Sequence, residues 1–200
     1  MNNELYGLVL AGGKSSRMKK DKASLRIHQE PQAVYCYKLL SKVCEKVFIS
    51  ARKDQEGALE HKDMPPIYDS PDLTGSGPIA GIISALREHP KRPWLVLACD
   101  LPFVNQEVLE KLINERNPQK KATAYKSSHD GLPEPLCTIF ESHSLQSLLD
   151  YVAKDKNCPR KFLINSDIKL IEQPFPEALD NINTPDELNK ALKKLGTEPN

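Results

Sequence analysis

Three features are missing from this 200-residue sequence: paired cysteines, long apolar runs and an excess of charge of one sign. The five cysteines form no C-x-x-C pair and are odd in number, so the sequence indicates neither a zinc site nor a disulfide framework. We expect all five to be buried free thiols. No segment comes close to the roughly 20 apolar residues of a membrane helix.

The net charge and the first residues of the sequence argue against a nucleic-acid-binding protein and against a secreted one. A formal net charge of +1 argues against a general polyanion binder, so we expect no nucleic-acid partner. The start, MNNELYGLVLAGG, has no basic region before an apolar run and no cleavage site. We therefore expect a cytoplasmic protein without a membrane partner. A length of 200 residues suits one domain, expected at residues 1–196 and followed by a frayed tail at 197–200, and a hydrophobic fraction of 39% supports its core.

The most informative stretch begins where an apolar strand, residues 5–10, runs into Ala11-Gly12-Gly13. Glycines at the end of a strand leave backbone N–H groups free and let them approach a ligand closely, which suits phosphate. Cations crowd the same stretch around a single acid, Asp21; they are Lys14, Arg17, Lys19, Lys20 and Lys22. Charge alone is typical of a solvated loop, but the glycines directly after the first strand favour phosphate binding.

Two well-known phosphate-binding motifs do not fit this loop. Gly13-Lys14-Ser15 looks like the end of a P-loop, but that motif requires a glycine at position 8, which is Leu8. A dinucleotide-binding G-x-G-x-x-G motif would require glycines in place of Lys14 and Arg17. The sequence therefore indicates neither a P-loop ATPase nor an ordinary Rossmann oxidoreductase.

Apolar strand-like runs alternate with amphipathic, helix-length segments. This alternation is typical of an α/β protein with a mostly parallel, twisted sheet and helices on both faces. The run 94–99 is the most hydrophobic and predicts a central strand buried on both faces. We expect the other strands at 5–10, 47–50, 122–125, 136–140 and 168–171, and helices at 32–44, 106–116 and 145–153 and beginning at 78, 159 and 185.

Polar residues stand at the carboxyl ends of these strands, where an open α/β sheet binds its ligands. Ser50 and Asp100 end two strands, and Asp69 precedes a turn-rich run that leads to Gly77. A carboxylate beside several phosphates would be repelled unless a cation lay between them, so Asp100 is a candidate Mg²⁺ ligand. The alternatives are an ordinary strand end at Ser50, a turn aspartate at Asp69 and a helix N-cap at Asp100, although Asn105 is the better cap candidate.

The loop L-A-G-G-x-S-x-R-M-x-x-D-K at residues 10–22 resembles that of nucleotidyltransferases, and the resemblance spans nearly the whole chain. The ordered motifs resemble those of molybdenum cofactor guanylyltransferases; they are Leu10-Ala11-Gly12-Gly13, Arg17-Met18, Asp21-Lys22, Asp69, Gly77-Pro78-Ile79-Ala80-Gly81, Cys99-Asp100-Leu101-Pro102 and Asn181-Ile182-Asn183-Thr184-Pro185. The resemblance implies a single-domain, Rossmann-like nucleotidyltransferase fold. Its nucleotide-binding half would span about 1–104 and its acceptor-binding half about 105–196.

The resemblance also implies an activity. It is the transfer of GMP from GTP to the phosphate of molybdenum-molybdopterin, with Mg²⁺ as cofactor and pyrophosphate as the second product. Transient contact with a molybdenum-inserting enzyme or a recipient apoenzyme is implied as well. Two alternatives stay open: a related transfer that uses CTP or another phosphorylated acceptor, and a nucleotide sensor without catalysis, because Lys19 and Lys20 stand where the family commonly has a glycine.

Site residues follow from the same resemblance. The nucleotide would be contacted by Leu10, Ala11, Gly12, Gly13, Lys22, Ser50, Asp69, Gly77 and Asp100, with Ser50 standing where the family often has Asn. Arg17, Lys22 and Asp100 would be catalytic, Asp100 as the metal ligand, and Asn181 and Asn183 would lie toward the acceptor. Arg160 and Lys161 begin a helix and face either the acceptor phosphate or solvent. His129, in the polar loop 126–135, is expected to be exposed rather than catalytic.

Overall fold

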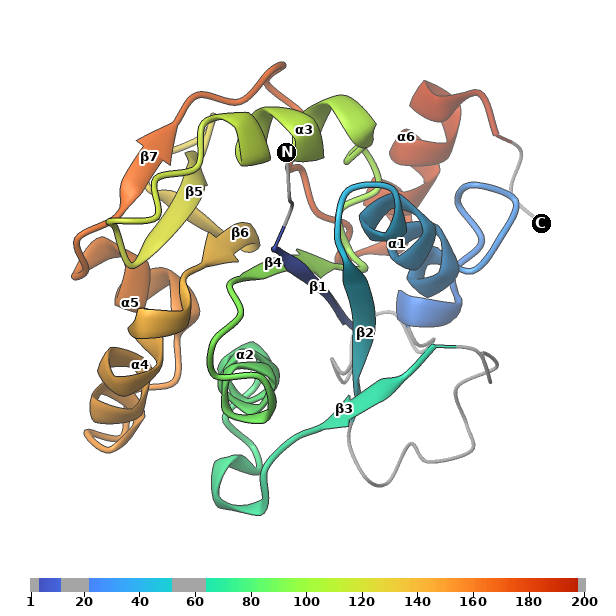
Figure 1. Ribbon diagram of the computed structural model, residues 1–200. Coiled ribbons are helices and arrows are strands. Elements are labelled where there is room, and N and C mark those ends of the chain that lie inside the picture. Colours follow the sequence, from blue (N-terminus) through green and yellow to red (C-terminus); the bar gives the residue numbers. More distant parts are fainter. Residues whose placement is uncertain (1–3, 12–21, 52–63, 198–200) are drawn as a thin grey trace.

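The computed structural model describes residues 4–11, 22–51 and 64–197, and its strands form one seven-stranded sheet in the order β3-β2-β1-β4-β6-β5-β7 (Figure 1). The strands are β1 Tyr6–Leu10, β2 Lys46–Ala51, β3 Pro66–Tyr68, β4 Trp94–Ala98, β5 Ala122–Lys126, β6 Pro133–Phe140 and β7 Lys169–Ile171. The helices are α1 Gln32–Ser41, α2 Pro78–Glu88, α3 Gln106–Asn114, α4 Leu145–Val152, α5 Pro159–Ile164 and α6 Pro185–Leu195, with short 3-10 helices η1 Lys22–Ser24, η3 Pro71–Leu73 and η4 Ser142–Ser144.

Parallel pairing dominates the described strands. β1 pairs in parallel with β2 and β4, and β2 pairs in parallel with β3. β6 is antiparallel to its neighbours β4 and β5, and β7 returns parallel to β5 at the edge of the sheet. The predicted mostly parallel sheet is confirmed. As a result, the carboxyl ends of β1 to β5 and β7 and the start of β6 lie along one edge.

Helices cover both faces of the sheet, as predicted (Figure 1). α1 and α3 pack on one face, and α2, α4 and α5 pack on the other. Alternate residues of each strand supply the two cores: Leu95 and Leu97 of β4 belong to the first, whereas Trp94 and Val96 belong to the second. β4 is buried along its whole length, which confirms the predicted central strand.

The structure departs from the predicted elements mainly at β3 and β6. The sequence pattern does not predict β3, a three-residue edge strand that begins with a proline. β6 begins at Pro133 instead of the predicted Leu136. Its pairing with β5 is irregular. Ala124 pairs with Thr138 and Lys126 pairs with Pro133, so β6 has extra residues between two paired positions that lie close together in β5. Such a bulge redirects the start of β6 at the edge of the sheet where the site lies.

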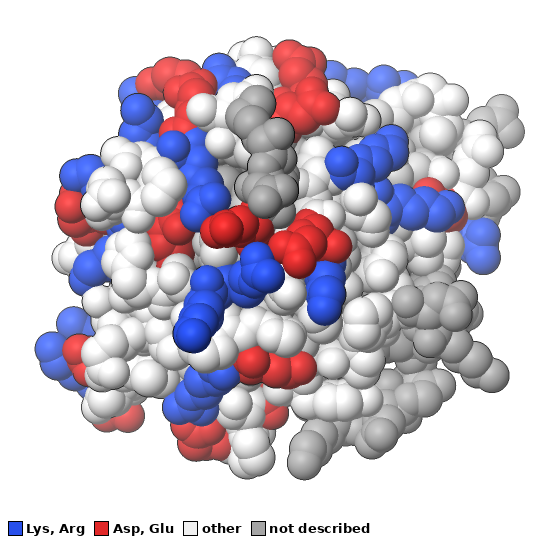
Figure 2. Space-filling view, in the orientation of Figure 1, with Lys and Arg blue, Asp and Glu red and all other residues white. Residues whose placement is uncertain are grey.

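The states of the cysteines and the distribution of surface charge agree in large part with what the sequence predicted. All five cysteines are free; Cys36, Cys99 and Cys137 are buried, but Cys44 and Cys158 are only half-buried, which corrects the prediction for those two. Burial raises the pKa of Cys44 to about 12, so its thiol stays protonated at neutral pH. On the face drawn in Figure 2, Lys and Arg are interspersed with Asp and Glu. Within the described ranges, no helix is long and apolar enough to cross a membrane.

Candidate active site

The carboxyl edge of the parallel strands brings three predicted site residues together. Leu10, the last residue of β1, pairs with Ser50 of β2 on one side and with Ala98 of β4 on the other. Asp69 directly follows β3, and its backbone N–H donates to the Ala51 carbonyl at 3.1 Å. Residues from four adjacent strands therefore reach one end of the sheet, where an open α/β sheet binds ligands.

The predicted phosphate-binding loop is described only at its two ends. Leu10 is half-buried and Ala11 is buried where β1 ends. Gly12, Gly13 and Arg17 lie outside the described residues, as do Lys19 and Lys20. The description resumes with the backbone of Lys22, the first residue of η1.

Helix α2 begins at this same edge, as predicted. Gly77 is its N-cap residue and has a φ of +69°, a left-handed conformation that favours glycine. Pro78 occupies the first helical position, where its missing N–H is not needed. The first turns of α2 lie beside the ends of β1 and β2, because Gly81 closely approaches Leu10 and Ser50.

The loop that carries Asp69 is held by α2. The backbone N–H of Ser70 donates to Ser84 Oγ at 2.9 Å. Arg87 donates to both carboxylate oxygens of Asp72 at 2.9 Å. These hydrogen bonds lower the pKa of Asp72 below its ordinary value. Two side chains of one helix thus fix the path of the loop between β3 and α2.

Gly81 lets α2 approach the sheet closely. A Cβ atom at this position would lie 2.3 Å from Ser50 Oγ and 3.1 Å from Leu10 Cδ2. The glycine at this position therefore allows α2 to pack directly on β1 and β2. Ser50, which is 5% exposed, is held directly under the first turns of α2.

Asp100 follows β4 and lies beside both halves of the chain. The backbone N–H of the preceding Cys99 donates to the Leu10 carbonyl at 3.3 Å, and the N–H of Ile182 donates to the Asp100 carbonyl at 2.9 Å. Asn105 caps α3 by accepting from the Val108 N–H at 3.1 Å. The N-cap alternative for Asp100 is therefore excluded, because α3 has its own cap.

The donor set at this edge fits Mg²⁺ held jointly with a nucleotide. Mg²⁺ in proteins is commonly bound through one or two carboxylates, with substrate phosphates and water completing its shell. Asp100 supplies one such hard oxygen donor at the sheet edge. The described residues contain no cluster of three or more His, Cys, Asp or Glu that could form an all-protein metal site.

Asn181 and Asn183 flank Ile182 and so lie next to Asp100. Ile182 is buried and packs in a small core with Leu25, Ala191 and Leu192. Beyond it, the predicted capping box of α6 is confirmed: Thr184 Oγ1 accepts from the Glu187 N–H at 3.3 Å, while Glu187 accepts from the N–H groups of Asn183 and Thr184. The backbone of the Asn181–Asn183 segment is therefore anchored at both ends.

His28 and Tyr35 contact the residues that follow Asp100, and no pattern in the sequence predicted these contacts. The ring of His28 stacks on Tyr35 with centroids 3.7 Å apart, and His28 Nε2 lies 2.9 Å from the Pro102 carbonyl. Tyr35 donates to the Val104 carbonyl at 3.2 Å. Burial lowers the pKa of His28, so the neutral ring donates its Nε2 proton to Pro102.

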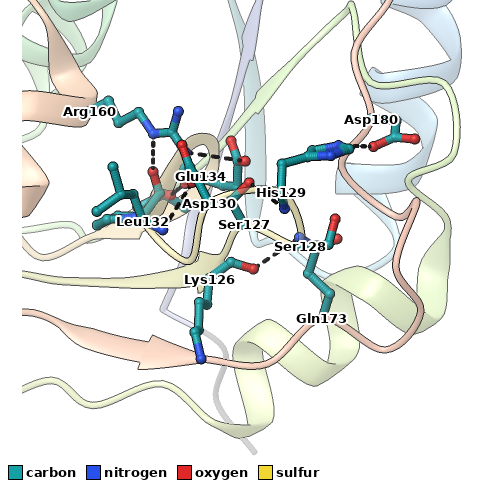
Figure 3. Close-up of polar contacts among 12 residues, drawn as sticks. Lys126, Ser127, Ser128, His129, Asp130, Leu132, Glu134, Arg160, Gln173 and Asp180 are labelled. Atoms are coloured by element: carbon teal, nitrogen blue, oxygen red, sulfur yellow. Dashed lines mark hydrogen bonds and ion pairs between the residues drawn. The ribbon is translucent and has the colours of Figure 1, made fainter.

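Arg160 and His129 have partners that the sequence does not reveal (Figure 3). Arg160 points to the β5–β6 turn, where it donates to the Pro133 carbonyl at 3.0 Å and to Asp130 at 2.7 Å. His129 is 74% exposed, as expected, and its Nε2 lies 2.8 Å from Asp180. These partners are about 30 and 50 residues away in sequence, so no local pattern could have identified them.

The MobA-like NTP transferase domain family matches residues 7–169. A molybdenum cofactor biosynthesis bifunctional protein of Synechocystis is 39% identical over 183 residues, a match that covers 92% of this chain and 52% of that protein. The chain thus spans about half the length of this relative. A protein of Nostoc named "Probable molybdenum cofactor guanylyltransferase" is 30% identical over 187 residues, covering 93% of this chain and 89% of that protein.

Solved structures share the fold. Molybdopterin-guanine dinucleotide biosynthesis protein A from Archaeoglobus fulgidus has a TM-score of 0.79 at 23% identity, and the match covers 96% of this chain and 98% of that one. A 4-diphosphocytidyl-2C-methyl-D-erythritol synthase from Anaerococcus prevotii has a TM-score of 0.66 at 14% identity and covers 96% of both chains. Together with the family match over most of its length, this likeness shows that the chain belongs to the MobA-like NTP transferase family.

Proposed function

We propose that this chain transfers GMP from GTP to the terminal phosphate of molybdenum-loaded molybdopterin. A phosphate oxygen of molybdopterin attacks the α-phosphorus of GTP, the bond from that phosphorus to the bridging oxygen breaks, and pyrophosphate leaves. The names of the Synechocystis and Nostoc relatives support this assignment. The structural observation that carries it is the hydrogen bond from Ile182 to the Asp100 carbonyl at 2.9 Å, because it joins the acceptor segment to the nucleotide edge.

The protein contributes mainly positioning and charge stabilisation, as is usual in phosphoryl-type transfers. Backbone N–H groups from Ala11 to Gly13 hold the β- and γ-phosphates. Arg17 and Lys22 neutralise the negative charge that develops on the leaving pyrophosphate. No serine, histidine or cysteine is needed as a nucleophile.

Asp100 is the residue that would hold Mg²⁺. When bound, the cation would supply positive charge that offsets the negative charge of the reacting phosphates. Asn181 and Asn183 orient the acceptor beside Asp100. Their amide groups suit this role because they both donate and accept hydrogen bonds.

The base and ribose of the nucleotide lie between the loop that carries Asp69 and the start of α2 at Gly77. Support comes from the burial of Ser50 under Gly81, which closes the sheet side of this region. The name of the Nostoc relative, a probable guanylyltransferase, supports the choice of GTP over CTP. We further propose that the product passes directly to a molybdenum-inserting enzyme or a recipient apoenzyme.

Transfer from α-labelled GTP and α-labelled CTP tests this function, with molybdenum-loaded molybdopterin as acceptor and with or without Mg²⁺. We expect label in the pterin product from GTP alone, and only with Mg²⁺. Transfer from CTP would retain the chemistry and change the base. If neither nucleotide labels the pterin while GTP still binds, the catalytic assignment is wrong and a nucleotide sensor becomes the better explanation.

A further inference from the structure

The turn between β5 and β6, residues 127–132, is closed by its own hydrogen bonds (Figure 3). The N–H of Ser127 donates to the Leu132 carbonyl at 2.8 Å, and the N–H of Gly131 donates to the Ser127 carbonyl at 3.0 Å. Asp130 Oδ1 accepts from the Leu132 N–H at 3.0 Å. Because these hydrogen bonds restrain one another, we expect residues 127–132 to move as one unit. A shift of Asp130 would then also shift Ser128 and His129.

Arg160 holds one side of this turn. Its Nε donates to the Pro133 carbonyl at 3.0 Å, and its Nη2 donates to Asp130 at 2.7 Å and lies 3.7 Å from the Glu134 carboxylate. A planar guanidinium can make such divergent contacts, whereas the single ammonium of a lysine cannot reproduce them. The side chain is therefore committed to the turn.

The other side of the turn holds the segment after β7. The side-chain contacts are Lys126 Nζ to Glu172 at 3.0 Å, Gln173 Nε2 to the Lys126 carbonyl at 2.9 Å, Ser128 Oγ to the Pro176 carbonyl at 2.7 Å and His129 Nε2 to Asp180 at 2.8 Å. Asp180 directly precedes Asn181. Each exposed contact alone is weak, but together they attach residues 172–180 to the end of β5 and to the turn. Lys126 of β5 contacts Glu172 and Gln173, and the turn itself contacts Pro176 and Asp180.

We infer that Arg160 is a positioning residue for the acceptor: it fixes the β5–β6 turn, and the turn fixes the segment that carries Asn181 and Asn183. The segment is also anchored by the bond from Ile182 to Asp100 and by the bonds from Asn183 and Thr184 to Glu187, so the turn sets the position of its first part, at Asp180 and Asn181. This inference deepens the proposed function and rests on it for the identity of the acceptor.

Direct binding of the acceptor phosphate by Arg160 is the competing explanation, and Asp130→Ala separates the two. If Arg160 binds the acceptor itself, the loss of Asp130 frees its guanidinium, and the KM for molybdopterin stays the same or falls. If Arg160 acts through the turn, Asp130→Ala breaks the same clamp as Arg160→Gln, and both variants raise that KM.

We expect Arg160→Gln and Asp130→Ala each to raise the KM for molybdopterin about tenfold, with the KM for GTP and kcat nearly unchanged. Arg160→Lys should not restore the KM, because a lysine keeps the charge but not both contacts. The matched control is Arg92→Gln. Arg92 pairs with Glu45 at 3.0 Å in a similar exposed ion pair just before β4, at the opposite end of the strands, and its replacement should leave all three constants unchanged.

Hydrogen exchange gives a readout that does not depend on transfer activity. In Arg160→Gln and Asp130→Ala, amides of residues 177–182 should exchange faster than in the unaltered protein, while those of β1 and β4 should not change. Unaltered exchange at 177–182 in both variants would overturn the inference, as would an unchanged KM in Asp130→Ala. Failure of the unaltered chain to label molybdopterin would instead reject the proposed function, and the exchange data would still decide whether Arg160 holds the segment.

Discussion

The position of Asp100 is set by the residues around it. It follows a buried strand, its own carbonyl is bonded to Ile182, and the next helix has a separate cap at Asn105. The backbone therefore holds Asp100 at the carboxyl edge of the sheet, and its carboxylate is not the cap of α3. We propose that this carboxylate supplies the charge stabilisation that phosphoryl-type transfer demands.

Asp100→Asn and Lys22→Ala should each keep the fold and lose transfer activity. Loss of one well-placed charged stabiliser costs on the order of 10²–10³ in rate. The measurement is the initial rate of label transfer from GTP, with thermal unfolding monitored in parallel. Asp150→Asn, on the exposed surface of α4, is the control and should retain the full rate. Near-normal turnover in either variant would remove its residue from the proposed mechanism.

Gly81→Ala should be destabilising because α2 cannot approach the sheet with a side chain at this position. The new Cβ would lie 2.3 Å from Ser50 Oγ, so the helix or the strand must shift. We expect a loss of about 1–3 kcal/mol in the free energy of unfolding, measured by urea denaturation. Adding Ser50→Ala removes the closest atom and should recover part of this loss. An unchanged midpoint in Gly81→Ala would show that the contact relaxes without cost.

At the scale of elements, α2 does two things: it packs on the sheet and it holds the loop before it. Ser84 and Arg87 restrain the loop from the helix side, while backbone bonds with β2 restrain its start. The position of Asp69 therefore depends on side chains fifteen or more residues further along the chain.

Acid should weaken the attachment of this loop. The hydrogen bonds from Arg87 lower the pKa of Asp72 in the folded state below that of a free aspartate. The ion pair therefore stabilises the fold fully above the pKa of the unfolded state, and this contribution is lost as the pH falls through the lowered pKa. The difference in stability between the unaltered protein and Asp72→Asn should therefore shrink as the solution is acidified. A difference that stays constant with pH would show that the ion pair adds nothing.

Sequence patterns predicted the elements well where local chemistry decides them. The start of α2 at Pro78, the cap of α3 at Asn105 and the capping box at Thr184 are each confirmed. The helix predicted at 32–44 ends earlier, at Ser41. The bulge at the start of β6 was missed, because it depends on pairing with β5 and not on the alternation of apolar residues.

At the scale of the whole molecule, a buried ion pair ties the end of β6 to the end of α3. Arg116 donates to both carboxylate oxygens of Glu141, at 2.6 and 2.7 Å, and the Glu141 side chain is only 5% exposed. Such a bidentate pair, largely removed from water, differs from the exposed pairs elsewhere in the described chain. It lies far in sequence from the motifs of the site.

Glu141→Gln should destabilise the whole fold by about 3 kcal/mol, because it leaves the Arg116 guanidinium largely buried without its counter-charge. Chemical denaturation gives this loss directly. Glu45→Gln, which breaks the exposed pair with Arg92, serves as the comparison and should cost well under about 1 kcal/mol. Equal losses in the two variants would mean that burial adds nothing to the Arg116–Glu141 pair.

The sequence by itself determined the α/β class, the buried central strand, the helix caps and the family, because these depend on local composition and on motifs read in order. Only the tertiary structure decided that Ile182 bonds to Asp100, that Gly81 packs on Ser50 and that Arg160 holds the β5–β6 turn. Those contacts join residues 30 or more positions apart. Their partners are set by the strand order and register of the folded sheet, which no local pattern encodes.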